Sequence, residues 1–99
     1  MNDITVMVSY RLQPGQVQTA LSAIRSLVSS VLTTEPDCKG IEILQEHSDQ
    51  TRVTLLERWT SRDAFLGPHM QQPHIHAFIR EAESFLGGPP EISFWRATA

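Results

Sequence analysis

The stretch Glu57-Arg58-Trp59-Thr60-Ser61-Arg62-Asp63-Ala64-Phe65, followed by His69, is the part of the chain from which the fold can be worked out. Its first three residues end a strand-like run, and by the period of two one face of that strand carries Val53, Leu55, Glu57 and Trp59. The apolar residues indicate that this face is buried, where a carboxylate is costly unless it is paired or protonated. We expect Glu57 either to pair with Arg11, Arg58 or a histidine, or to orient a ligand in a pocket.

The end of this strand predicts a short helix. Thr60 is expected to be its N-cap, with Asp63 three residues later completing a variant of the capping box. The helix should cover residues 61–66, because Gly67-Pro68 interrupts it.

The other elements follow from the same kind of pattern. Alternation predicts strands, amphipathic periods predict long helices, and Pro or Gly marks the ends. The expected elements are a strand over 4–12, a helix over 17–31, a hairpin of strands over 41–47 and 52–60, a helix from Pro73 to Leu86, and a strand over 92–97. This β-α-β-β-α-β order predicts a single ferredoxin-like domain over 1–99 with a four-stranded antiparallel sheet.

Composition excludes several classes of function. The chain has 99 residues, a formal net charge of −3 and no basic patch, so nucleic acid and anionic membranes are poor partners. No apolar run approaches the roughly 20 residues of a membrane span, and the N-terminus lacks the pattern of a signal peptide. The single cysteine, Cys38, fits a reducing cytoplasm and a small buried side chain at a strand start.

Two helices can cover only one face of such a sheet. The other face is expected to carry apolar side chains as well, namely Met7, Leu44, Leu56 and, if its face matches, Trp95. An uncovered apolar patch indicates a partner. We therefore expect a homodimer formed sheet against sheet.

Among the four histidines, His69 is the candidate for chemistry. It follows Gly67-Pro68 near one end of the sheet, where an imidazole can accept a proton from an acidic phenol. His74 and His76 should lie on different sides of a helix, so the i, i+4 spacing of a helical zinc pair is absent and no metal site is expected. Nucleotide-binding and acyl-enzyme motifs are also absent.

Glu57-x-Trp59, then Thr60-Ser61-x-Asp63-Ala64-Phe65 and His69, resembles the motif of the antibiotic biosynthesis monooxygenase (ABM) domain family. The opening strand, Pro14-Gly15, the hairpin and the Pro73-led helix with Phe78 match as well. The resemblance implies a ferredoxin-like subunit, a dimeric α+β barrel and a cavity between sheet and helices. Trp59 would wall that cavity, Glu57 would lie below it and His69 would face its opening.

The family includes cofactor-independent oxygenases of phenols, quinols and anthrone-like polyketides, haem-degrading enzymes, and members with no assigned activity. The haem-degrading branch has a tryptophan and an axial histidine that match Trp59 and His69 in spacing. That branch also has an asparagine on its first strand, where this chain has Val8, Ser9 and Tyr10. The match at Trp59 and His69 makes haem the alternative cofactor. On the first strand, where that branch has its asparagine, Tyr10 can hydrogen-bond an aromatic substrate.

Three functions follow from these residues. The first is a monooxygenase of an electron-rich aromatic that uses O₂ and needs no bound cofactor. His69 would be its base, with Trp59 and Glu57 as further catalytic residues, and the substrate would contact Tyr10, Arg11, Leu55, Phe65 and Phe78. The second is haem binding or degradation. The third is a dimeric binding module without activity, whose cavity would be filled by its own side chains.

Overall fold

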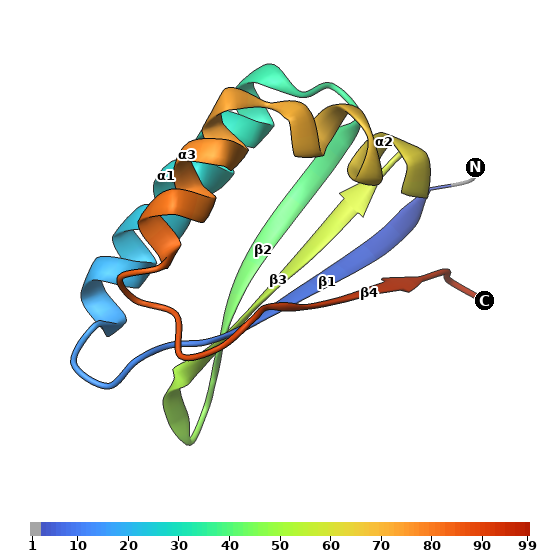
Figure 1. The fold of residues 1–99 in the computed structure, drawn as a ribbon. Coiled ribbons are helices and arrows are strands. Elements are labelled where there is room, and N and C mark those ends of the chain that lie inside the picture. Colours follow the sequence, from blue (N-terminus) through green and yellow to red (C-terminus); the bar gives the residue numbers. More distant parts are fainter. Residues whose placement is uncertain (1–2) are drawn as a thin grey trace.

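The computed structural model describes residues 3–99, in which helices cover one face of a sheet (Figure 1). The strands are β1 (Ile4–Arg11), β2 (Cys38–Glu46), β3 (Asp49–Trp59) and β4 (Glu91–Trp95). The helices are α1 (Val17–Thr34), α2 (Arg62–Leu66), the 3-10 helix η1 (Pro68–Gln71) and α3 (Pro73–Ala82). The expected β-α-β-β-α-β order is confirmed. The predicted short helix is α2, and the 3-10 helix η1 lies between α2 and α3.

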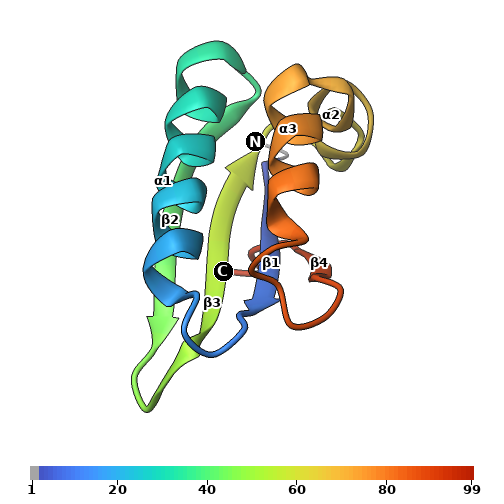
Figure 2. The same cartoon turned by 60° about the vertical axis from the view of Figure 1, so that its left-hand side comes forward.

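The sheet is antiparallel throughout, with strand order β2-β3-β1-β4. Figure 2 shows α1 and α3 side by side over the same face of it. This arrangement confirms the predicted ferredoxin-like fold.

The register of β1 against β3 decides which side chains face the helices. Val6 lies opposite Glu57 and Tyr10 lies opposite Val53, and all four are buried. Arg11, one residue beyond Tyr10, has the opposite parity and is exposed on the outer face opposite Arg52. The predicted substrate contact Arg11 therefore lies on the face of the sheet away from the helices.

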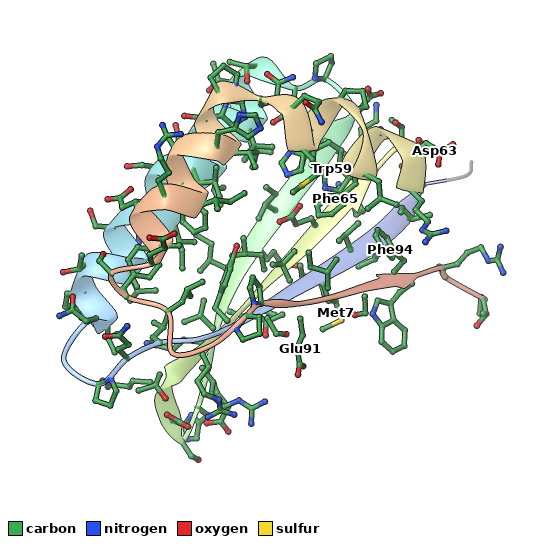
Figure 3. All side chains as sticks on the ribbon, viewed as in Figure 1. Met7, Trp59, Asp63, Phe65, Glu91 and Phe94 are labelled. Atoms are coloured by element: carbon green, nitrogen blue, oxygen red, sulfur yellow. The ribbon has the colours of Figure 1, made fainter. Side chains whose placement is uncertain are left out.

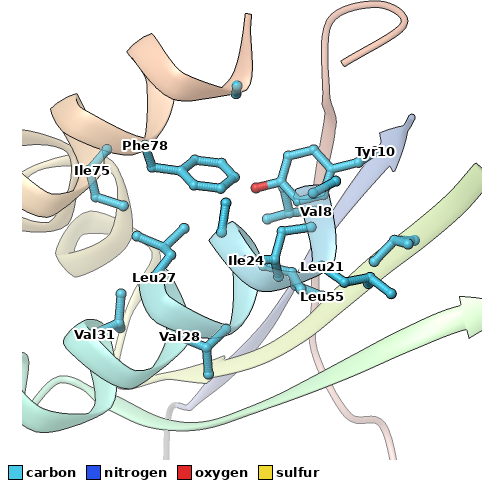
Figure 4. Close-up of a cluster of buried hydrophobic side chains, with 14 of the residues drawn as sticks. Val8, Tyr10, Leu21, Ile24, Leu27, Val28, Val31, Leu55, Ile75 and Phe78 are labelled. Carbon is cyan, nitrogen blue, oxygen red and sulfur yellow. The ribbon is translucent and has the colours of Figure 1, made fainter. Parts of the chain in front are cut away.

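The helix α1 packs through the predicted apolar stripe. Its entry is a turn at Gly15, whose φ of 84° favours glycine. The stripe meets β1, β3 and α3 in one cluster, shown in Figure 4, which includes Val8, Tyr10, Leu21, Ile24, Leu27, Val28, Val31, Leu55, Ile75 and Phe78.

The helix α3 ends at Ala82, although the apolar pattern predicted its continuation to Leu86. The backbone of the following residues bonds instead to the end of β1. Gln13 donates its backbone N–H to the carbonyl oxygen of Phe85 at 2.8 Å, and Gly87 donates to that of Arg11 at 2.7 Å. The N–H groups of Ser84, Phe85 and Leu86 still bond back to Glu81 and Ala82, so the regular helix ends in a turn before the pairing with β1 begins, and Phe85 is still fully buried.

The short helix α2 is capped one residue later than predicted. Ser61, not Thr60, is the N-cap, and its hydroxyl accepts the backbone N–H of Ala64 at 3.0 Å. The hydroxyl of Thr60 donates instead to the carboxylate of Asp37, in the turn before β2. Thr60 therefore ties the end of β3 to the start of β2.

The outer face of the sheet has the predicted apolar side chains. Met7 lies opposite Leu56 at its centre, and Leu44 and Trp95 follow on the two edge strands, 44% and 56% exposed. In Figure 3, Met7 points away from the helices, whereas Trp59 and Phe65 lie between the sheet and α2. Among the described helices none is long and apolar enough to cross a membrane.

Candidate functional site

A cavity of about 530 Å³ lies between the sheet and the two long helices. Its walls come from all four strands, from α1, α2, η1 and α3, and from the segment that leads into β4. Most lining side chains are apolar, and the predicted contact residues Leu55, Phe65 and Phe78 are among them. Titratable side chains also line it, namely Tyr10, Glu57, His69 and Glu83. The cavity is therefore a mainly apolar chamber with polar groups at fixed points.

Glu57 is buried on the helix face of β3, as its parity predicted. Its Oε1 accepts the indole N–H of Trp59 at 2.8 Å, so of the two alternatives the pairing with Arg11, Arg58 or a histidine is not the one formed. Burial raises the pKa of Glu57 to about 7, against the opposing effect of the indole bond and with a further rise from the charge of Glu35. Near neutral pH the carboxyl can therefore both donate and accept a proton.

His69 lies in η1 and is buried, with its ring against two aromatic rings. The centroid of Trp59 is 4.5 Å away and that of Phe65 is 4.9 Å away. Desolvation lowers the pKa of His69, although the hydrogen bond and charge of Glu35 oppose the shift. A neutral imidazole is the form that can accept a proton.

Glu35 is the functional candidate that the sequence patterns did not reveal. It lies at the C-cap of α1, and both of its carboxylate oxygens lie within hydrogen-bond distance of His69 Nδ1, at 3.0 and 3.1 Å. Oε2 also lies 2.6 Å from Nε2 of His74. The only signal in the sequence was a carboxylate after an apolar helix, and no spacing linked it to residues 34 and 39 positions later.

Tyr10 reaches the cavity from β1. Figure 4 shows its hydroxyl directed toward Phe78, and the two ring centroids are 5.9 Å apart. Burial is the main reason that the pKa of Tyr10 lies above its ordinary value, and the charge of Glu57 adds to the rise. The hydroxyl therefore stays protonated and can donate a hydrogen bond.

Trp59 occupies a different place from the one expected. It is 1% exposed and does not line the cavity, but packs behind it against Phe65 and His69. It contacts Glu57 through its N–H and His69 through its ring, so it holds both groups in place. The expectation that Trp59 walls the cavity is wrong. Within residues 3–99 no cluster of His, Cys, Asp or Glu is arranged to hold a metal ion.

Comparison with known proteins gives the same family as the residue pattern. A family model described as antibiotic biosynthesis monooxygenase matches residues 3–81. A curated relative, the uncharacterized protein sll1783 of Synechocystis, is 27% identical over 62 residues, which are 63% of this chain and 42% of the relative. The chain thus spans less than half of that relative's length.

Solved structures share the fold over nearly the whole chain. A conserved protein from Methanosarcina mazei has a TM-score of 0.87 at 24% identity, and the match covers 99% of this chain and 95% of that protein's chain. A candidate antibiotic biosynthesis monooxygenase from Caulobacter crescentus has a TM-score of 0.89 at 21% identity, with 99% and 92% covered. PA3566 from Pseudomonas aeruginosa has a TM-score of 0.86 at 23% identity, with 99% and 97% covered.

Proposed function

Because the chain belongs to the antibiotic biosynthesis monooxygenase family, we propose that it is a monooxygenase of a neutral, electron-rich aromatic such as a quinol or polyketide phenol. The observation that carries the proposal is the mainly apolar cavity, in which a buried imidazole and a carboxyl of raised pKa share one chamber. An oxidation that needs no bound cofactor requires a base, a proton donor and apolar surroundings that keep water from the reacting atoms.

The reaction begins with proton removal. His69 takes the proton of a phenolic hydroxyl, and the resulting anion passes one electron to O₂ to give a substrate radical and superoxide. The two radicals combine at a ring carbon that carries hydrogen, and the resulting peroxide takes back the proton held by His69 to form a hydroperoxide. His69 then removes the ring hydrogen as a proton while the O–O bond breaks and the departing hydroxide takes a proton from Glu57, which leaves a quinone carbonyl and water. One oxygen atom thus enters the substrate and the other leaves as water, and the proton on His69 returns to Glu57.

The other polar groups have separate roles in this scheme. Protonated Glu57 supplies the proton that lets hydroxide leave, since its pKa of about 7 keeps a large protonated fraction near neutral pH. Tyr10 donates a hydrogen bond to a substrate oxygen. Leu55, Phe65 and Phe78 surround the ring and exclude water from the radical pair.

The lining also indicates the charge of the substrate. Among the described residues, no Lys or Arg lines the cavity, whereas Glu57 and Glu83 do. An anionic ligand would lose its hydration without gaining a cationic partner. The site therefore favours a neutral aromatic.

The same lining is a poor match to haem. Nε2 of His69 is available for iron, but the two propionates of haem would find no cation among the described lining residues. Titration with hemin tests this alternative. A Soret shift that is lost in His69→Ala would favour haem over the monooxygenase.

A binding module without activity was expected to have Trp59 and Phe78 packed solid. Trp59 is packed in this way, but Phe78 lines an open cavity. The open volume favours a small-molecule site over a filled core.

We also propose that two copies pair through the outer faces of their sheets. The apolar centre of this face, Met7 and Leu56, lies between cationic side chains on the central strands, such as Arg58, and carboxylates on the edge strands, Glu42 and Glu91. Stacking two copies about a two-fold axis buries the apolar centre and allows opposite charges to meet.

The test is oxygen consumption with a panel of quinols and polyketide phenols, with ¹⁸O₂ to follow incorporation into the product. His69→Gln should lower the rate about 100-fold or more, because the base is lost while a side chain that can donate to Glu35 remains. His76→Gln is the matched control, since His76 is exposed and lies within hydrogen-bond distance of the backbone oxygen of Met70. Wild-type rates in His69→Gln would exclude His69 as the base.

A further inference from the structure

The carboxylate of Glu35 lies between two imidazoles that come from different elements. Glu35 follows α1, His69 belongs to η1 and His74 lies in the first turn of α3. Figures 1 and 2 both show the end of α1 beside the beginning of α3. His69 Nδ1 is 3.0 Å from Oε1, and His74 Nε2 is 2.6 Å from Oε2.

The three side chains form a buried chain from the cavity toward solvent. The side chains of His69 and Glu35 are each 6% exposed, and that of His74 is 18% exposed. Within residues 3–99 the two histidines are the only groups that form an ion-pair contact with Glu35. A buried carboxylate without an Arg or Lys partner therefore depends on these two imidazoles.

The contact with Glu35 gives the tautomer that we expect for His69. An ionised carboxylate only accepts hydrogen bonds, so Nδ1 of His69 is the N–H donor. Nε2 is then the nitrogen with a free lone pair, and no hydrogen bond within the described residues occupies it. His69 lines the cavity, and its ring packs against Trp59 and Phe65, so an unoccupied Nε2 can serve a ligand there.

The backbone of Glu35 is also held in place. Its N–H donates to the carbonyl oxygen of Val31 at 2.9 Å, and its own carbonyl oxygen accepts the N–H of Cys38 at 3.1 Å. The carboxylate thus projects from a fixed point between the end of α1 and the start of β2. A rigidly held acceptor of this kind orients an imidazole better than a flexible one.

We propose that Glu35 and His74 are positioning residues for His69. Glu35 holds the imidazole of His69 as its Nδ1–H tautomer, with Nε2 available to the cavity. His74 shares the carboxylate of Glu35, so that this carboxylate attracts the proton of His69 less strongly. The orientation is a property of the ligand-free protein. Its use for taking a substrate proton rests on the proposed function.

The charged surroundings of His69 give the direction of each effect. The hydrogen bond and charge of Glu35 raise the pKa of His69, and the charge of His74 lowers it. Glu57 on β3 lines the same cavity, and Cys38 on β2 has its pKa raised to about 11, mainly by burial, so that it stays a neutral thiol. Loss of the Glu35 charge should therefore lower the pKa of His69, and loss of His74 should raise it.

Long-range ¹H–¹⁵N NMR of the ligand-free protein tests the proposal, because it reports the tautomer and pKa of each histidine. Wild-type protein should show His69 as the Nδ1–H tautomer. Glu35→Gln should mix the two tautomers and lower the pKa of His69 by about 1 or more. His74→Gln keeps a donor for the carboxylate and should raise that pKa, whereas the control His76→Gln should leave His69 unchanged.

An Nε2–H tautomer of His69 in wild-type protein would overturn the proposal, and so would a pKa that Glu35→Gln leaves unchanged. If Glu35→Gln does not fold, the wild-type tautomer and His74→Gln still decide. The measurement needs no turnover, so failure of the proposed function is seen separately as absent oxygen consumption in wild-type protein. Where the protein is active, the pH profile of kcat/KM should move with the pKa of His69 in each variant.

Discussion

Replacing Glu57 with glutamine should remove a large part of the pH dependence of folding stability. Burial raises the pKa of this carboxyl from its ordinary 4.5 to about 7. A folded-state pKa above the unfolded-state value means that the unfolded chain releases the proton first as pH rises. The stabilisation is complete below pH 4.5, is lost progressively as pH rises toward 7, and is absent above that.

The size of the effect follows from the same values. A tenfold change in proton affinity corresponds to about 1.4 kcal/mol, so a pKa raised from 4.5 to about 7 corresponds to about 3 kcal/mol in total. Between about pH 5 and pH 8 the loss should be about 2.5 kcal/mol, since part of it has occurred by pH 5. Glu57→Gln keeps an oxygen that can accept the indole N–H of Trp59 but does not titrate.

Urea unfolding at a series of pH values measures this directly. The free energy of unfolding of wild-type protein should fall by about 2.5 kcal/mol more than that of Glu57→Gln between about pH 5 and pH 8. Glu81→Gln, an exposed position on α3, is the control and should follow wild type. Parallel curves for wild type and Glu57→Gln would refute the reasoning, because they would mean that Glu57 is ionised in the folded protein at its ordinary pKa.

Three further outcomes are expected. Trp59→Phe removes the indole donor that stabilises the charged form, so the pKa of Glu57, followed by ¹³C NMR, should rise above its wild-type value. Ser61→Ala removes the hydroxyl that accepts the N–H of Ala64 and should lower the free energy of urea unfolding by about 1 kcal/mol. Leu56→Arg places two like charges at the centre of the proposed dimer interface and should weaken dimerisation about 100-fold or more, as seen by analytical ultracentrifugation. An unchanged dimer would place the interface elsewhere.

The fold was predictable because each element has a local periodicity. The structure contains the predicted alternation from Ile4 and the predicted apolar stripe of α1. Burying one face of a strand or a helix requires apolar residues at the spacing of that element. Boundaries were less predictable, because backbone groups at element ends have alternative partners. Thr60 shows this, since its hydroxyl binds Asp37 across the sheet end instead of capping α2.

Parity within a strand separates the predicted strand residues that line the cavity from Arg11, which does not. Tyr10, Leu55 and Glu57 have the parity of the buried face, and all line the cavity. Arg11 has the other parity, so its exclusion from the cavity was already contained in the alternation of β1. Glu35 had no such local rule, because its contacts with His69 and His74 depend on how α1, η1 and α3 meet in space.

The early end of α3 brings the segment that follows it to one wall of the cavity. A helix continued to residue 86 would carry Phe85 seven positions after Phe78, on the same face and over the sheet. Instead, the backbone of residues 85–87 pairs with the end of β1, and the chain returns to β4 through Gly88, Pro89 and Pro90, which line the cavity. The pairing that ends the helix against its own apolar pattern thus also sets the course of the segment that forms one wall of the chamber, while Phe85 stays fully buried against Phe78, with their ring centroids 5.9 Å apart.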